Sequence, residues 1–140
     1  MKAKTRRAVQ TRWLYRAEKT LLKGNVYANC DMPMEYLRSL AKRVWAAEAP
    51  RGRKFPSIKA ADGLHWGGKF TSYCMGFTEI VIARHHRTVL VLLHELTHAL
   101  GPCQHGPKFV RLYFYQLRKY ARFDESFLQG VAAGRGIVLN

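Results

Sequence analysis

The chain has 140 residues, with 48% apolar and 12% aromatic side chains, and 24 Lys and Arg against 9 Asp and Glu give a formal net charge of +15. This length and composition fit one folded domain with its own hydrophobic core and exclude a disordered polymer. The positive charge favours a polyanionic partner, first nucleic acid and second an anionic membrane surface, although a basic composition kept for solubility would look the same.

Sequence features also indicate the cellular compartment of the protein. The basic start, residues 1–8, is not followed by the apolar core of a signal peptide, and the longest apolar run, Val89–Leu93, is too short to cross a bilayer. The odd number of cysteines, without a C-x-x-C pair, suits a reducing compartment: Cys30, Cys74 and Cys103. We therefore expect a cytoplasmic protein without a membrane partner, with a basic tail over residues 1–8 and a single domain over residues 9–140.

Two helices are expected in the first third of the chain. Helical spacing of apolar residues predicts one over residues 9–23, which Gly24-Asn25 would end. Its basic face is either solvated or turned toward phosphates: Arg12, Arg16, Lys19 and Lys23. The other should run from Asp31, as N-cap, to about Ala49, because Pro50 stops it.

A basic loop and short strands follow. Residues 50–56 lie between two prolines and form either a nucleic-acid contact or a solvated loop. Extended segments are expected over residues 57–59, 69–75 and 77–83, and the last two are joined at Gly76. Three short strands in a small mixed or antiparallel sheet, together with helices, indicate an α+β fold.

The last part of the chain is expected to be helical. After the basic connector Arg84–Arg87, a helix should run from about Thr88 to Leu100, where Gly101-Pro102 ends it. Pro107 then opens a helix that reaches about Arg122. Asp124 is expected to cap a short final helix, and the glycines from 130 to 136 indicate a fraying end.

The run from His94 to His98 carries the chemistry. It has the pattern H-E-x-x-H within the apolar helix predicted for residues 88–100. Because a helix turns once per 3.6 residues, His94 and His98 lie on the same face and can meet one cation. Glu95 lies beside them, where it can accept a proton from a metal-bound water. Burying these groups is otherwise costly, which favours a metal site over a packing role.

A catalytic zinc needs a third protein ligand and one open position. His105 is the first candidate, because the break at Gly101-Pro102 lets the chain turn back toward the helix. Glu125, from a downstream helix, and Cys103, as a thiolate, are the alternatives. The remaining histidines are less suited as zinc ligands. His85 and His86 belong to a basic surface segment, and His65, beside Trp66, is expected to be structural or exposed.

Residues 94–109, H-E-L-T-H-A-L-G-P-C-Q-H-G-P-K-F, resemble the SprT-like and WLM metallopeptidases, which include Spartan-type and Wss-type proteases of DNA–protein crosslinks and small phage and bacterial proteins. The resemblance implies a zincin-like fold, zinc held by His94, His98 and His105, and Glu95 as catalytic base. It also implies that the strand before the helix, Glu79–Ala83, is an edge strand that pairs with extended substrate.

Three hypotheses follow. The first is a zinc endopeptidase whose substrate is a protein or peptide. Tyr113, Tyr115 or an arginine would stabilise the oxyanion. In a narrower form, the substrates are proteins bound to nucleic acid. The second is a basic nucleic-acid-binding protein whose structural zinc has Cys103 as fourth ligand. The third is a metal hydrolase that attacks a carbonyl other than a peptide.

Overall fold

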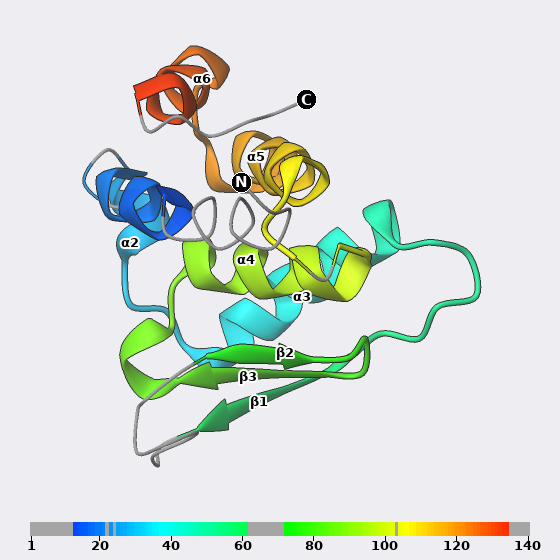
Figure 1. Ribbon diagram of the computed structural model, residues 1–140. Coiled ribbons are helices and arrows are strands. Elements are labelled where there is room, and N and C mark those ends of the chain that lie inside the picture. Colours follow the sequence, from blue (N-terminus) through cyan, green and yellow to red (C-terminus); the bar gives the residue numbers. More distant parts are fainter. Residues whose placement is uncertain (1–12, 22, 24, 62–71, 103, 135–140) are drawn as a thin grey trace. The chain divides into compact units, whose positions relative to one another are not determined.

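Figure 1 shows a computed structural model of the protein, which describes residues 13–21, 23, 25–61, 72–102 and 104–134. Its contacts divide the chain into two compact units, one of residues Cys30–Gly101 and one made from the segments on either side. The fold is α+β, as predicted. The single domain over residues 9–140 stays a prediction, and the basic tail of residues 1–8 lies outside the described residues.

The unit of residues 30–101 contains a small mixed sheet. Strand β1 (Ser57–Ala61) pairs in parallel with β3 (Glu79–Ala83), and β2 (Tyr73–Met75) pairs with β3 in antiparallel fashion. The β2–β3 turn passes through Gly76, whose φ of 58° is in the region that glycine adopts most easily. The predicted strands and the mixed sheet are thus confirmed over the described residues.

The expected role of residues 79–83 as an edge strand is wrong. The strand order is β1-β3-β2, so both hydrogen-bonding sides of β3 are already paired. Ile80 and Ile82 are fully buried in this central position. Among the described strands, the edges of the sheet are β1 and β2, and an extended substrate would have to pair there.

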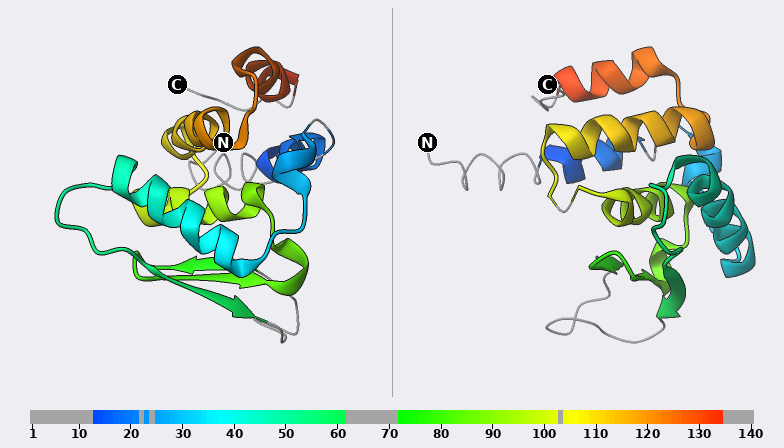
Figure 2. Two further views of the ribbon diagram at one scale, coloured as in Figure 1. Left: turned by 180° about the vertical axis from the view of Figure 1, so that it is seen from behind. Right: turned by 90° about the vertical axis from the view of Figure 1, so that its right-hand side faces the viewer.

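Helices α3 (Met34–Glu48) and α4 (Val89–Leu100) belong to the same unit as the sheet, and α4 contacts α3, β2 and β3. Figures 1 and 2 show both helices on the same side of the sheet. Their apolar faces form the core of this unit, with side chains such as Leu37, Val44 and Leu93 fully buried. The sheet therefore supports the helix that carries H-E-x-x-H.

The start of α3 differs from the expectation. Asp31 is not its N-cap, because the helix begins at Met34 and the capping position is Pro33. The backbone N–H of Met32 donates to the carbonyl of Arg87, which holds this segment outside the helix. The expected end is nearly right, since the helix stops at Glu48, two residues before Pro50.

The second unit is helical in its described residues. It contains helical residues 13–21, the short α2 (Val26–Asn29), α5 (Pro107–Ala121) and α6 (Glu125–Gly134). Helix α2 was not predicted; the Asn25 side chain accepts from the Ala28 N–H at its start and donates to the Ala121 carbonyl. The frayed end expected from residue 130 is wrong as far as Gly134, because burial of Leu128 and Ala132 holds α6 together.

Cys30 and Cys74, for which the sequence favours small buried side chains, are instead partly exposed. In the part of the chain that the structure describes, no helix combines the length and the apolar character needed to cross a bilayer.

Candidate metal centre

Helix α4 begins where the sequence predicts. The Thr88 hydroxyl accepts a hydrogen bond from the Val91 N–H at 3.2 Å, which satisfies one of the first unpaired donors of the helix. The short 3₁₀ helix Arg84–His86 leads from β3 into this cap. Because the strand, the connector and the cap are continuous, the sheet fixes where the helix starts.

The helix buries His94 and Glu95 together with its apolar residues. His94 is 5% exposed and Glu95 is 7% exposed, amid neighbours such as Leu93 and Leu96 that are fully buried. A histidine and a carboxyl group in such surroundings cost free energy unless partners or a bound ion compensate. This burial agrees with the sequence argument that packing alone does not explain the motif.

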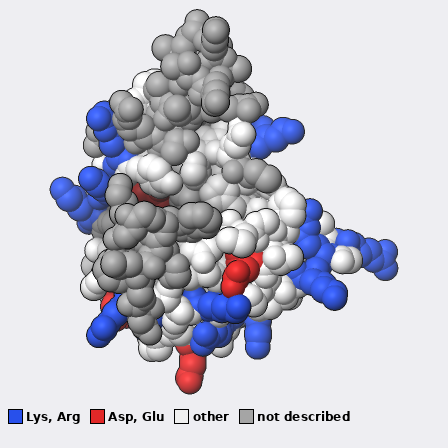
Figure 3. Space-filling model, turned by 60° about the horizontal axis from the view of Figure 1, so that its bottom comes forward, with Lys and Arg blue, Asp and Glu red and all other residues white. Residues whose placement is uncertain are grey.

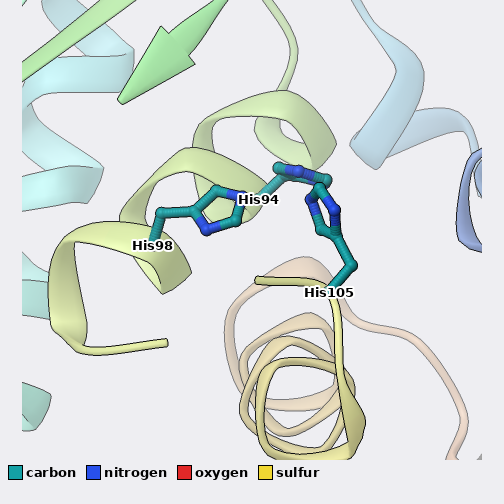
Figure 4. Close-up of side chains that lie close together, drawn as sticks. All are labelled: His94, His98 and His105. Carbon is teal, nitrogen blue, oxygen red and sulfur yellow. The ribbon is translucent and has the colours of Figure 1, made fainter. Parts of the chain in front are cut away.

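His94 and His98 lie one turn apart on α4, with ring centroids 5.2 Å apart and planes inclined by 63°. Figure 4 shows both side chains leaving the same helix. This is the arrangement that the four-residue spacing predicts. Of the two, His94 is buried and His98 is partly exposed.

His105 lies just before α5, in the segment that Gly106 and Pro107 lead into the helix. Its ring makes edge contacts with Tyr15, at a centroid distance of 5.6 Å, and with Phe109, at 4.8 Å. These ring contacts restrict the orientation of the imidazole. Sequence reasoning missed both of these contacts; the one with Phe109 could have been suspected because Phe109 lies only four residues after His105.

The three histidines bring their nitrogens together. One ligand atom from each of His94, His98 and His105 lies within 4.8 Å of the others, and Figure 4 shows the three side chains as a group. Around a tetrahedral zinc with Zn–N bonds of about 2.0–2.1 Å, such atoms lie about 3.3 Å apart. Small ring rotations would close that difference, so three neutral imidazoles fit a zinc ion with one position left for another ligand.

The predicted alternatives to His105 have different outcomes. Glu125 lies on α6 with 61% of its side chain exposed, and its carboxylate pairs with Arg118 at 3.3 Å. It is not in the histidine cluster, which removes it as the third ligand in this structure. Cys103 lies outside the described residues, so its role stays a prediction.

Of the residues predicted to stabilise an oxyanion, Tyr113 is unsuitable. It is fully buried, and its hydroxyl donates to the Glu18 carboxylate at 2.7 Å. Tyr115 is partly exposed and accepts a hydrogen bond from Lys119 at 3.2 Å.

Arg53 supports the carboxyl end of α4. Its guanidinium donates to the Ala99 carbonyl at 3.1 Å and lies 4.5 Å above the centre of the Phe77 ring. A cation is favourable at this end of a helix, where unpaired carbonyls carry partial negative charge. The sequence showed only a basic loop here, because the partners of Arg53 are distant in the chain.

The other histidines take no part in the described cluster. His86 is partly buried and lies 3.1 Å from the Ser72 hydroxyl, and burial lowers its pKa from the ordinary value, with His85 lowering it further. His85 is exposed, as expected for the basic connector. His65 lies outside the described residues.

Comparisons of the chain with protein-family models, with curated proteins and with solved structures found no match.

Proposed function

We propose that the protein is a zinc-dependent endopeptidase of the SprT-like type. The observation that carries the proposal is the approach of the His94, His98 and His105 ligand atoms to within 4.8 Å, with two of them in an H-E-x-x-H motif on a buried helix. Three imidazoles and an adjacent carboxylate are one of the sets that hydrolytic zinc sites use. The zincin-like fold is part of this proposal.

A zinc ion at this site would polarise the substrate carbonyl and lower the pKa of a water molecule. Glu95 would accept the proton of the attacking water and pass it to the leaving amine. Glu95 is 7% exposed, so little bulk solvent would compete with the attacking water for its carboxylate. His94, His98 and His105 would hold the metal through neutral nitrogens.

Access to the site favours catalysis over a closed structural centre. His98 and His105 are both partly exposed, so a substrate can approach the two ligands. Within the unit of residues 30–101, β2 contacts α4 and has an unpaired side among the described strands. We propose that an extended substrate pairs with β2, in place of the buried β3.

The narrower form of the proposal names nucleic-acid-bound proteins as substrates. It rests on the net charge of +15, which attracts polyanions at long range. On the face drawn in Figure 3, Lys and Arg side chains stand out around the margin and few acidic ones lie among them. This part can fail while the peptidase proposal stands.

The test compares the parent with Glu95→Gln and His94→Ala. Metal content after zinc loading and cleavage of a fluorescently labelled unfolded protein are measured for each. We expect zinc and cleavage in the parent, zinc without cleavage in Glu95→Gln, and neither in His94→Ala. Cleavage by Glu95→Gln at the parent's rate, or a parent that binds no zinc, would refute the proposal.

The structural-zinc alternative predicts a different response. Cys103→Ala should then lower zinc affinity as strongly as the loss of a histidine, because a closed site needs four protein ligands. For the peptidase, Cys103→Ala should leave zinc binding and cleavage close to the parent's.

A further inference from the structure

A cationic stripe runs along α5 on the side away from its buried face. Tyr115 is partly exposed, and it stands among three exposed cations of the helix: Lys108, Arg111 and Arg118. Spacings of three and four residues place these four residues on one side of the helix. Arg122 follows the helix as its left-handed C-cap, and its guanidinium lies over the Tyr27 ring at 4.4 Å. Helix α5 itself contains no Asp or Glu.

Beside this stripe, residues of α5 and α6 line an open pocket of about 270 Å³. The two helices belong to the same unit and run side by side in Figures 1 and 2. Phe114, Tyr115 and Leu128 provide apolar surface, and Arg111 and Arg118 provide charge. The acidic residue of the lining, Glu125, pairs with Arg118 at 3.3 Å in an exposed position.

The aromatic ring of Tyr115 lies close to cationic side chains of the same helix. The Arg118 guanidinium lies 5.7 Å from its ring centroid and the Lys119 ammonium 5.5 Å, and Lys119 also donates to the Tyr115 hydroxyl. An aromatic ring among arginines and lysines is the combination with which proteins bind single strands, because the ring stacks on a base and the cations contact phosphates. A duplex would use the cations but not the ring.

We propose that the α5 stripe and the α5–α6 pocket bind single-stranded nucleic acid, with phosphates along Arg111 and Arg118 and a base against Tyr115. From Lys108 to Arg118 the stripe is about 15 Å long, which matches roughly four nucleotides at a rise of ~3.4 Å. The inference goes beyond the peptidase proposal and does not depend on it, because no metal ligand is involved.

The experiment uses the full chain with Glu95→Gln, so that cleavage plays no part, and a labelled oligothymidylate of about twelve nucleotides. Fluorescence anisotropy gives the dissociation constant. The double variant Arg111→Ala/Arg118→Ala should weaken binding by about tenfold or more and reduce the slope of log affinity against log salt by about 1.4, since each phosphate contact contributes about 0.7. Circular dichroism verifies that the variants remain helical.

A matched control removes the same charge from the other unit. Lys42 and Arg43 are exposed on α3, and Lys42→Ala/Arg43→Ala should change the affinity by less than about threefold. Equal losses in the two double variants would overturn the proposal, because they would show that only total charge matters.

Two further variants test the single-strand assignment. Tyr115→Leu should weaken binding by about tenfold and Tyr115→Phe by less than twofold, because stacking needs the ring and not the hydroxyl. Glu125→Gln should strengthen binding, since it frees Arg118 from its carboxylate partner. Undiminished binding by Tyr115→Leu, with a duplex of equal length bound as tightly as the single strand, would overturn the assignment.

Discussion

At the scale of single residues, the metal centre depends on a short segment between two helices. His94 and His98 are fixed by the geometry of α4, whereas His105 is held by the rings of Tyr15 and Phe109. The third ligand is therefore the one whose position depends on contacts outside its own element.

We predict that His105→Ala lowers zinc affinity by at least about 100-fold, because even the loss of a residue that only orients a ligand costs 10–100-fold. A competition titration with a chromophoric chelator measures this change. Gln104→Ala, at an exposed neighbouring position, is the control and should bind zinc like the parent. Parent-like affinity in His105→Ala would assign the third ligand elsewhere.

A second residue-scale prediction concerns His86. Its pKa is lowered by burial, so on acidification the unfolded chain takes up this proton at a higher pH than the folded chain does. The free energy of unfolding should therefore fall as the pH drops through the ordinary value of 6.5. In His86→Gln, which can still hydrogen-bond to Ser72, urea unfolding between about pH 7.5 and 5 should show a smaller fall. Parallel profiles in the two proteins would contradict this account.

At the scale of elements, α4 is held at both ends by side chains. Thr88 caps its start, and Arg53, from the loop between α3 and β1, contacts the Ala99 carbonyl near its end. Since His94 and His98 both lie between these points, the two contacts limit how the ligand pair can shift.

We predict that Arg53→Ala lowers the free energy of unfolding by ~1–2 kcal/mol, through loss of a charged hydrogen bond and of the favourable charge at the helix end. Arg53→Lys should recover part of this loss, because it keeps the charge but not the planar donor. Urea denaturation measures both. Arg51→Ala, exposed in the same loop, should stay within about 0.5 kcal/mol of the parent.

At the scale of the whole molecule, zinc is expected to contribute to stability as well as to chemistry. The ligands span residues 94–105, and a folded chain that binds the ion gains stability by mass action. At a zinc concentration of about 100 times the dissociation constant, the gain is ~2.7 kcal/mol.

We therefore predict a higher melting temperature with zinc than with a chelator, measured by circular dichroism. His94→Ala should melt at the same temperature in both conditions. A parent whose melting temperature does not respond to the chelator would show that zinc is not bound under these conditions.

The sequence by itself determined the local features: the α+β class, the limits of α4, the start of α5 at Pro107, and the pairing of His94 with His98. Each follows from helix periodicity or from capping and proline rules that act over a few residues. The same local rules misplaced the start of α3, since they could not include the bond from Met32 to Arg87.

Only the tertiary structure decided the features that join distant parts of the chain. In the structure, Glu79–Ala83 is the central strand of the sheet, and the Tyr113 hydroxyl donates to Glu18. Glu125 pairs with Arg118 and is not in the histidine cluster. Arg53 donates to the Ala99 carbonyl near the end of α4. The physical reason is that strand order and side-chain partners depend on contacts between residues far apart in sequence, for which a single sequence contains no periodic signal.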